Sequence, residues 1–158
     1  ETPSRPSSSP CPTTLIAWAS KRSQTSSEAE VDLLLDTHLL LWAAAEPHRL
    51  PEEAAALISD SGNRLYFSAA SLWEIVIKNG LNRDDFSVDP HILRRGLIEN
   101  GYRELAISVP HVLAIAHLPP IHRDPFDRVL VAQAESEGLR LLTSDERVSS
   151  YPGPIRRV

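Results

Sequence analysis

VDLLLDTH, residues 31–38, is the stretch that decides the fold. Three consecutive leucines, Leu33 to Leu35, lead to the carboxylate of Asp36, and a run of leucines and alanines follows at once. A continuous apolar run is typical of a parallel strand that is buried on both faces. Such a strand ends at the carboxyl edge of a sheet, where the chain turns into a helix. We therefore expect Asp36 to lie at that edge as the first member of a metal-binding carboxylate cluster.

The length and composition of the chain indicate an ordinary globular domain. Its 158 residues are 42% hydrophobic and 23% charged, and Trp42 and Trp73 are interpreted as core aromatics. The single cysteine excludes an internal disulfide framework and favours a reducing compartment, so we expect a cytoplasmic protein. No apolar run approaches the roughly 18 residues of a membrane span, and no membrane partner is expected. The net charge of −5 counts against nonspecific DNA coating.

Residues 1–30 differ in composition from the rest of the chain. They are rich in Ser and Thr, contain four of the 13 prolines and show little apolar periodicity. This composition is typical of a disordered or loosely docked segment. The sequence also lacks methionine and opens on Glu1. We expect residues 1–30 to be a disordered or non-native leader, and residues 31–158 to form the domain.

From Val31 onward, strand-like and helix-like patterns alternate. Strands are predicted over 31–35, 65–67, 104–107 and 139–143, with room for an edge strand in 151–158. Helices are predicted over 37–45, from Pro51, over 71–80, over 90–99, over 110–117 and over 125–137. Alternation of this kind predicts an α/β domain, with three layers (α/β/α) and a mainly parallel central sheet.

Four carboxylates follow strand-like runs, namely Asp36, Glu74, Asp127 and Asp145. Because the carboxyl ends of parallel strands face one crevice, we expect these side chains to converge. Clustered like charges repel and raise one another's pKa, so such a cluster persists when a divalent cation neutralises it. Magnesium and manganese prefer carboxylate ligands, and no Cys/His set with zinc spacing competes. The pattern therefore indicates a magnesium or manganese site.

Each of these acids also has a purely structural explanation. Asp36 and Asp124 each precede a helix, as N-cap residues do. Glu74 stands three residues after Ser71, which matches a capping box. Asp145 fits a turn. Taken alone, no one of these acids distinguishes a ligand from a structural residue.

The DPFD turn, residues 124–127, contributes two acids to this pattern. If Asp124 is the N-cap and Pro125 the first helical residue, Asp127 is left to face the crevice. Arg123 and Arg128 flank the two acids. They hold a phosphate group or pair with the acids, and the sequence favours neither arrangement.

Four segments together resemble the PIN-domain family, and specifically its VapC-type toxins of bacterial toxin–antitoxin pairs. The segments are LLLDTHLLLW (33–42), SAASLWEIVIKNG (68–80), LPPIHRDPFDRVLVAQA (118–134) and LRLLTSD (139–145). They occur in the order typical of the family and span essentially all of 31–158. The resemblance places the catalytic, metal-ligating acids at Asp36, Glu74, Asp127 and Asp145, with assisting polar groups at Thr37, Asp124, Thr143 and Ser144. Asn82 departs from the pattern, in a turn where glycine is expected.

The resemblance implies a metal-dependent endoribonuclease. One or two magnesium ions, or manganese, would position and deprotonate a water for in-line attack on an RNA phosphodiester. The implied products are a 5′-phosphate and a 3′-hydroxyl, and Arg123 and Arg128 are candidate contacts to RNA phosphates. The implied partners are an RNA recognised by its single-stranded or loop shape, a VapB-like antitoxin that occludes the groove, and a second copy in a homodimer.

Two other functions fit parts of the sequence. A non-catalytic domain of the same fold would bind RNA or protein and keep its acids as helix caps. A phosphoryl-transfer receiver domain would also carry acids after strands, but it would need paired acids after the first strand and a lysine late in the sheet. The only lysines are Lys21 and Lys78, which counts against a receiver domain.

Overall fold

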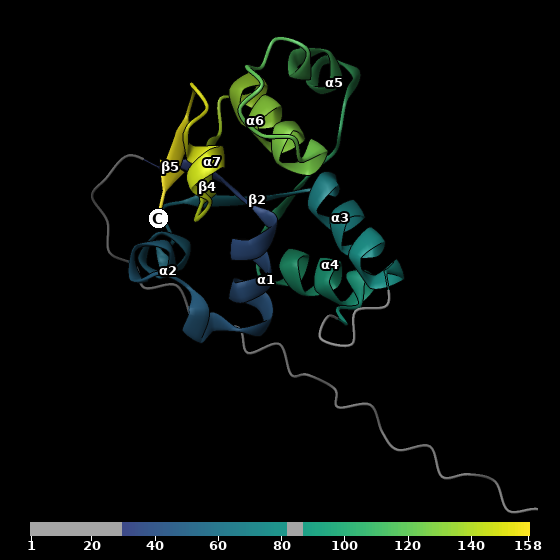
Figure 1. The fold of residues 1–158 in the computed structure, drawn as a ribbon. Helices are drawn as coiled ribbons and strands as arrows, with labels where there is room; N and C mark the ends of the chain where they lie inside the picture. Colours follow the sequence, from purple (N-terminus) through teal and green to yellow (C-terminus); the bar gives the residue numbers. More distant parts are fainter. Residues whose placement is uncertain (1–29, 82–86) are drawn as a thin grey trace, which may run out of the picture.

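The computed structural model describes residues 30–81 and 87–158 (Figure 1). The segment expected to be a leader lies outside the described residues, apart from Glu30, and so does Asn82. In the described part of the chain the strands form a sheet of order β3-β2-β1-β4-β5 in which every pair is parallel. The strands are β1 (Asp32–Leu35), β2 (Arg64–Ser68), β3 (Arg103–Leu105), β4 (Arg140–Thr143) and β5 (Ile155–Arg157). The α/β class and the parallel sheet are thereby confirmed.

Helices connect and cover these strands. They are α1 (Thr37–Ala45), the short 3-10 helix η1 (Pro47–Arg49), α2 (Glu52–Ser59), α3 (Ala69–Gly80), α4 (Pro90–Glu99), α5 (Val109–Ile115), α6 (Pro125–Glu137) and α7 (Glu146–Ser149). The predicted bounds of α4 and α6 are correct, and in both an aspartate N-cap precedes a proline. Asp124 caps α6 ahead of Pro125, and Gly138 ends it in the left-handed region at φ 67°. The short elements η1 and α7 have too little periodicity to be predicted.

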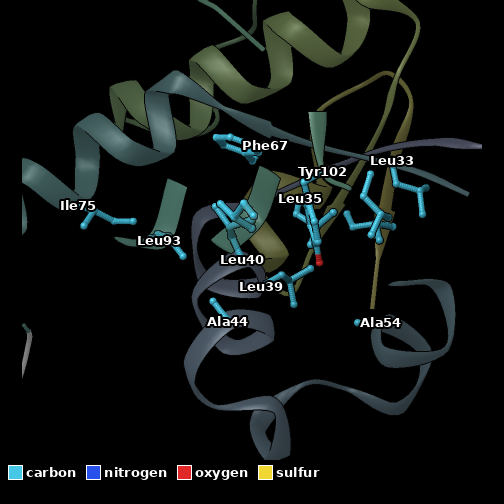
Figure 2. Close-up of a cluster of buried hydrophobic side chains, with 13 residues drawn as sticks. Leu33, Leu35, Leu39, Leu40, Ala44, Ala54, Phe67, Ile75, Leu93 and Tyr102 are labelled. Carbon is cyan, nitrogen blue, oxygen red and sulfur yellow. The ribbon is translucent and has the colours of Figure 1, made fainter. Parts of the chain in front are cut away.

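The sheet separates two hydrophobic clusters. Leu33 and Leu35 of β1 point into one cluster with α1, α2, α3 and α4, and Figure 2 shows them in this cluster together with Phe67 of β2. Leu34 points the opposite way, into a cluster with α6 and α7. Successive side chains of a strand alternate between the faces of a sheet, so a continuous leucine run fills both clusters. The three predicted α/β/α layers are therefore confirmed.

The strand order reverses next to β1. The chain runs outward from β1 to β2 and β3, and then returns to place β4 on the other side of β1. The backbone N–H of Asp36 donates to the carbonyl oxygen of Leu142 at 3.0 Å, which continues the β1–β4 ladder to the very end of β1. Crevices for ligands form outside the carboxyl ends of strands at such a reversal. Asp36 and Asp145 follow the two strands that flank it.

Trp73 is not a core residue, contrary to the sequence-based interpretation. Its side chain is 55% exposed on α3 and packs edge-to-face against Phe126 of α6, with ring centroids 5.1 Å apart. The helix presents Ile75 to the core instead. Trp42, by contrast, is partly buried and packs against the first cluster. None of the described helices is long and apolar enough to cross a membrane.

Candidate active site

Asp36 lies at the junction of β1 and α1 and is almost completely buried. One carboxylate oxygen accepts the backbone N–H of Leu39 at 2.8 Å. The side chain therefore caps α1, in agreement with the structural explanation that the sequence offers for Asp36. Burial raises the pKa of the Asp36 carboxyl, and three hydrogen bonds oppose that effect. They come from the N–H of Leu39, the hydroxyl of Thr143 and the backbone N–H of Ser144, and the charge of His38 acts in the same direction.

Thr143 joins two of the predicted acids at the end of β4. Its hydroxyl hydrogen-bonds the Asp36 carboxyl, and its Oγ1 accepts the backbone N–H of Asp145 at 3.0 Å. Asp145 in turn caps α7 by accepting the N–H groups of Arg147 and Val148 at 2.7 and 3.3 Å. Thr143 therefore contacts Asp36 and the backbone of Asp145 through its hydroxyl, whereas Ser144 contacts Asp36 through its backbone N–H.

Glu74 is buried on α3 and forms an ion pair with Lys78, one turn later, at 2.6 Å. The capping box that the spacing of Ser71 and Glu74 allowed as an alternative is not formed, because α3 begins two residues earlier than predicted and its N-cap is Ser68. Ser71 instead lies inside the helix, where its Oγ accepts the hydroxyl of Thr37 at 3.0 Å. Thr37 therefore links α1 to α3.

Asp127 lies in the first turn of α6 and has the most informative electrostatics of the site. Its side chain is 21% exposed, and its pKa is raised to about 7. Partial burial is the first cause, and the charges of four other carboxylates follow. These are Asp124, Glu74, Asp36 and Asp145. The structure therefore brings all four sequence-predicted acids, together with Asp124, into one electrostatic neighbourhood.

A histidine two residues before the DPFD turn, His122, also lies at the site. Nδ1 of His122 accepts the backbone N–H of Asp124 at 3.0 Å and lies 3.6 Å from Oδ2 of Asp127. Asp124 itself caps α6 through the N–H of Phe126 at 2.9 Å. His122 thus lies beside Asp127 and helps to shape the turn that presents it.

Arg128 holds the loop that precedes α6 through hydrogen bonds. Its two terminal nitrogens donate to the carbonyl oxygens of Ile115, Leu118, Pro119 and His122 and to the hydroxyl of Tyr151, over distances of 3.1 to 3.5 Å. A guanidinium group with this many acceptors holds its loop together and has little capacity left for a phosphate group. Arg123, on the same turn, is exposed.

The candidate acids are neighbours without forming a finished metal site. Among residues 30–81 and 87–158, no three His, Cys, Asp or Glu side chains are arranged closely enough to hold a metal ion as they stand. These acids have protein partners instead: Asp36, Asp124 and Asp145 cap helices, and Glu74 pairs with Lys78. The donor set still fits a hard divalent cation, because it consists of carboxylates, and their repulsion adds to burial in raising the pKa of Asp127.

Comparisons with known proteins agree with this geometry. The family model described as "PIN domain" matches residues 33–154. The chain belongs to the PIN-domain family. Ribonuclease VapC22 of Mycobacterium tuberculosis is 32% identical over 124 residues, which cover 77% of this chain and 93% of that protein. The resemblance to VapC-type PIN domains is confirmed.

Two solved structures share the fold. One is VapBC2 of Rickettsia felis bound to a DNA fragment from its promoter, with a TM-score of 0.59 and 13% identity. The match covers 81% of this chain and 99% of that one. The other is DNA-bound VapBC of Salmonella typhimurium, with a TM-score of 0.53 and 16% identity over 80% and 98% of the two chains. At these identities the structures support the PIN fold alone.

Sequence patterns alone do not place two further side chains, Lys78 and His122, at this PIN-domain site. Lys78 was considered only as evidence against a receiver domain, although its spacing of four residues from Glu74 is the signal for an ion pair on one helix face. For His122 the sequence carries no comparable signal. Its contact with the DPFD turn depends on a bend in the loop that sequence periodicity does not report.

Proposed function

We propose that this PIN domain is a magnesium-dependent endoribonuclease of the VapC type that cleaves RNA phosphodiester bonds. The observation that carries the proposal is the environment of Asp127, whose pKa the neighbouring carboxylates help to raise to about 7. Such crowding of acids at a strand-order reversal contributes no stability by itself, and a bound cation relieves it. The sequence similarity to a VapC ribonuclease also supports the proposal.

The proposed ligands are Asp36, Glu74, Asp127 and Asp145, and manganese is the alternative to magnesium. When bound, the metal supplies Lewis acidity that activates water and stabilises charge on a phosphate group. The protein contributes the positions of the acids: the Thr143 hydroxyl orients Asp36 and, through the backbone, Asp145. Forming the site requires these carboxylates to turn toward one another, and Glu74 to exchange Lys78 for the metal.

Of the two arginines that are candidate contacts to RNA phosphates, we propose Arg123 for this role. Its side chain is exposed beside the turn that carries Asp127, where a phosphate group of single-stranded or loop RNA would approach the acids. Arg128 is excluded from this proposal because its guanidinium nitrogens already donate to carbonyl oxygens and to Tyr151.

The proposed partners are a VapB-like antitoxin and a second copy of the chain, in the cytoplasm. Exposed apolar side chains on two helices support association with protein. They are Trp73, Val76 and Ile77 on α3, and Val109, Val112 and Leu113 on α5. The two solved structures that share the fold are of toxin–antitoxin type by their names, which supports an antitoxin partner.

One observation favours a second candidate function, a non-catalytic PIN module that binds RNA or protein. Asp36, Asp124 and Asp145 each cap a helix, so these acids have a structural use without any metal. The two candidates differ in catalysis, because the module binds RNA or protein and cleaves neither.

Cleavage of RNA by the purified chain decides between the two candidates. Total RNA would be incubated with wild-type protein and Mg²⁺, with and without EDTA, and the new 5′ ends mapped by sequencing. We expect wild-type cleavage that EDTA stops and that Asp36→Asn lacks. Asp89→Asn is the matched control, because Asp89 caps α4, is not among the carboxylates that raise the pKa of Asp127, and Asn caps equally well. Cleavage that survives both EDTA and Asp36→Asn would refute the nuclease proposal, and binding without cleavage would favour the module.

A further inference from the structure

Buried side-chain hydrogen bonds join three of the elements that carry the candidate acids. The hydroxyl of Thr37 on α1 donates to Oγ of Ser71 on α3 at 3.0 Å. The hydroxyl of Ser68, at the start of α3, donates to Oε1 of Gln133 on α6 at 2.6 Å. All four residues are at least 98% buried. Helices α1, α3 and α6 are the helices that begin at or carry Asp36, Glu74 and Asp127.

Gln133 carries the largest polar group among these four buried residues, and the burial of its amide requires an explanation. Its side chain is completely buried on α6, in a stretch of the helix where Val131 and Ala132 are buried as well. Its Oε1 accepts from Ser68, and its Nε2 donates to the carbonyl oxygen of Ala106 at 3.3 Å. A buried amide is costly unless it is hydrogen-bonded, and an apolar side chain would fill the same space without that requirement. Gln133 therefore specifies one relative placement of α6, α3 and the segment after β3.

The placement that Gln133 specifies bears directly on two acids. Asp127 stands six residues before Gln133 on α6, and Glu74 stands six residues after Ser68 on α3. Six residues of α-helix span about 9 Å, so each helix is a short rigid arm between the buried bond and its acid. A shift at the Ser68–Gln133 bond is transmitted along both arms.

We propose that Gln133 is a positioning residue of the acid cluster, which sets the spacing of Glu74 and Asp127 through its hydrogen bond to Ser68. The proposal rests on the proposed function, because the spacing matters only if both carboxylates ligate one metal centre. Gln133 does not touch the acids and acts through the packing of α3 against α6. Ligand spacing must be held within about 0.5 Å for a metal site to work, which is the scale on which a single buried hydrogen bond acts.

The same helix offers a matched control. Glu137 of α6 hydrogen-bonds the buried His111 of α5 at 2.7 Å, and α5 carries none of the candidate acids. Both bonds therefore tie α6 to a neighbouring helix, but only the bond of Gln133 ties it to a helix with an acid. A general loss of α6 stability would follow from either variant, whereas a loss of ligand spacing would follow only from the Gln133 variant.

The experiment titrates Mn²⁺ into the full chain by calorimetry and compares wild type with Gln133→Met, Ser68→Ala, the double variant and Glu137→Ala. Thermal unfolding in EDTA reports stability separately. We expect Gln133→Met and Ser68→Ala each to weaken Mn²⁺ binding by about tenfold or more, the range seen when an outer partner of a metal ligand is removed. The double variant should bind no more weakly than Gln133→Met, and Glu137→Ala should bind within about twofold of wild type.

The possible outcomes separate this proposal from the proposed function. Wild-type affinity in Gln133→Met, or an equal loss in Glu137→Ala, overturns the positioning role while the metal site stands. Absence of Mn²⁺ binding to the wild type overturns the metal site and, with it, the reason for positioning. If Gln133→Met does not fold, Ser68→Ala decides, because it removes the same bond and leaves the volume of α6 unchanged. It also removes the N-cap bond from the backbone N–H of Ala70, and thermal unfolding in EDTA reports that loss separately.

Discussion

Asp127→Asn tests the electrostatics of the site in the metal-free protein. The substitution keeps the shape of the side chain and removes its charge. Wild-type Asp127 has its pKa raised from 3.8 to about 7 in the folded state. At about 1.4 kcal/mol per pKa unit, that shift corresponds to at most about 4 kcal/mol of destabilisation by the ionised carboxylate. Because the side chain is 21% exposed and partly screened by solvent, we expect about 2 kcal/mol.

The sign of this effect follows from proton linkage. Below about pH 4 the carboxyl is protonated in both states and costs nothing. As the pH rises toward 7 the unfolded chain releases its proton before the folded chain does, so wild-type stability falls, and the full penalty applies above pH 7. Asp127→Asn carries no such penalty. Its advantage over wild type should therefore grow between about pH 5 and pH 8.

Urea unfolding in EDTA at those two pH values measures this advantage. Asp89→Asn is again the control, because it removes a carboxylate that caps α4 outside the cluster, and its effect should be small at both pH values. A second series with Mg²⁺ should stabilise the wild type and leave Asp127→Asn unchanged. An Asp127→Asn variant that is no more stable than wild type at pH 8, or whose advantage is the same at both pH values, would refute the assigned crowding of charge.

Three further predictions concern the residues around the site. Lys78→Met leaves Glu74 buried without its ion pair, so the free energy of unfolding in EDTA should fall by about 1–3 kcal/mol. The affinity for Mn²⁺, measured by calorimetry, should rise because a competing cation is gone. Weaker Mn²⁺ binding would contradict this. Arg128→Met should cost about 2–4 kcal/mol in urea unfolding, since several carbonyl oxygens lose their donor; a change below about 0.5 kcal/mol would show that the loop does not depend on it. Gly138→Ala should cost about 1–2 kcal/mol by the same measurement because its φ is 67°, and an unchanged stability would contradict strain at that position.

The class of fold and the edge at which the acids lie follow from the sequence by itself. The leucine run before Asp36 supplies apolar side chains to both faces of a strand, and only a sheet covered on both sides uses such a run. The helix ends marked by Asp124 and Gly138 are likewise local, because a cap or a left-handed residue acts within one turn. The order of the four acids along the chain and their junctions with strands belong to this same local information.

Sequence patterns do not determine contacts between residues that are distant along the chain. The spacing of Ser71 from Glu74 allows Ser71 to be the N-cap. In the folded chain Ser68 is the N-cap of α3, and its hydroxyl also donates to Gln133. Trp73 has the hydrophobicity of a core residue, and the rotation of α3 against α4 and α6 leaves it exposed. In both cases the local pattern allowed more than one arrangement, and the packing of helices selected one of them.

The tertiary structure also decided the chemical state of the acids. A sequence states that Asp127 is a carboxylate, but its pKa depends on burial and on charges brought from β1, α3 and the end of β4. It likewise states that Arg128 lies beside two acids, and only the folded loop directs its guanidinium group to backbone carbonyls. Electrostatic and hydrogen-bonding energies depend on distances through space, and these distances exist only once the sheet has brought its strands together.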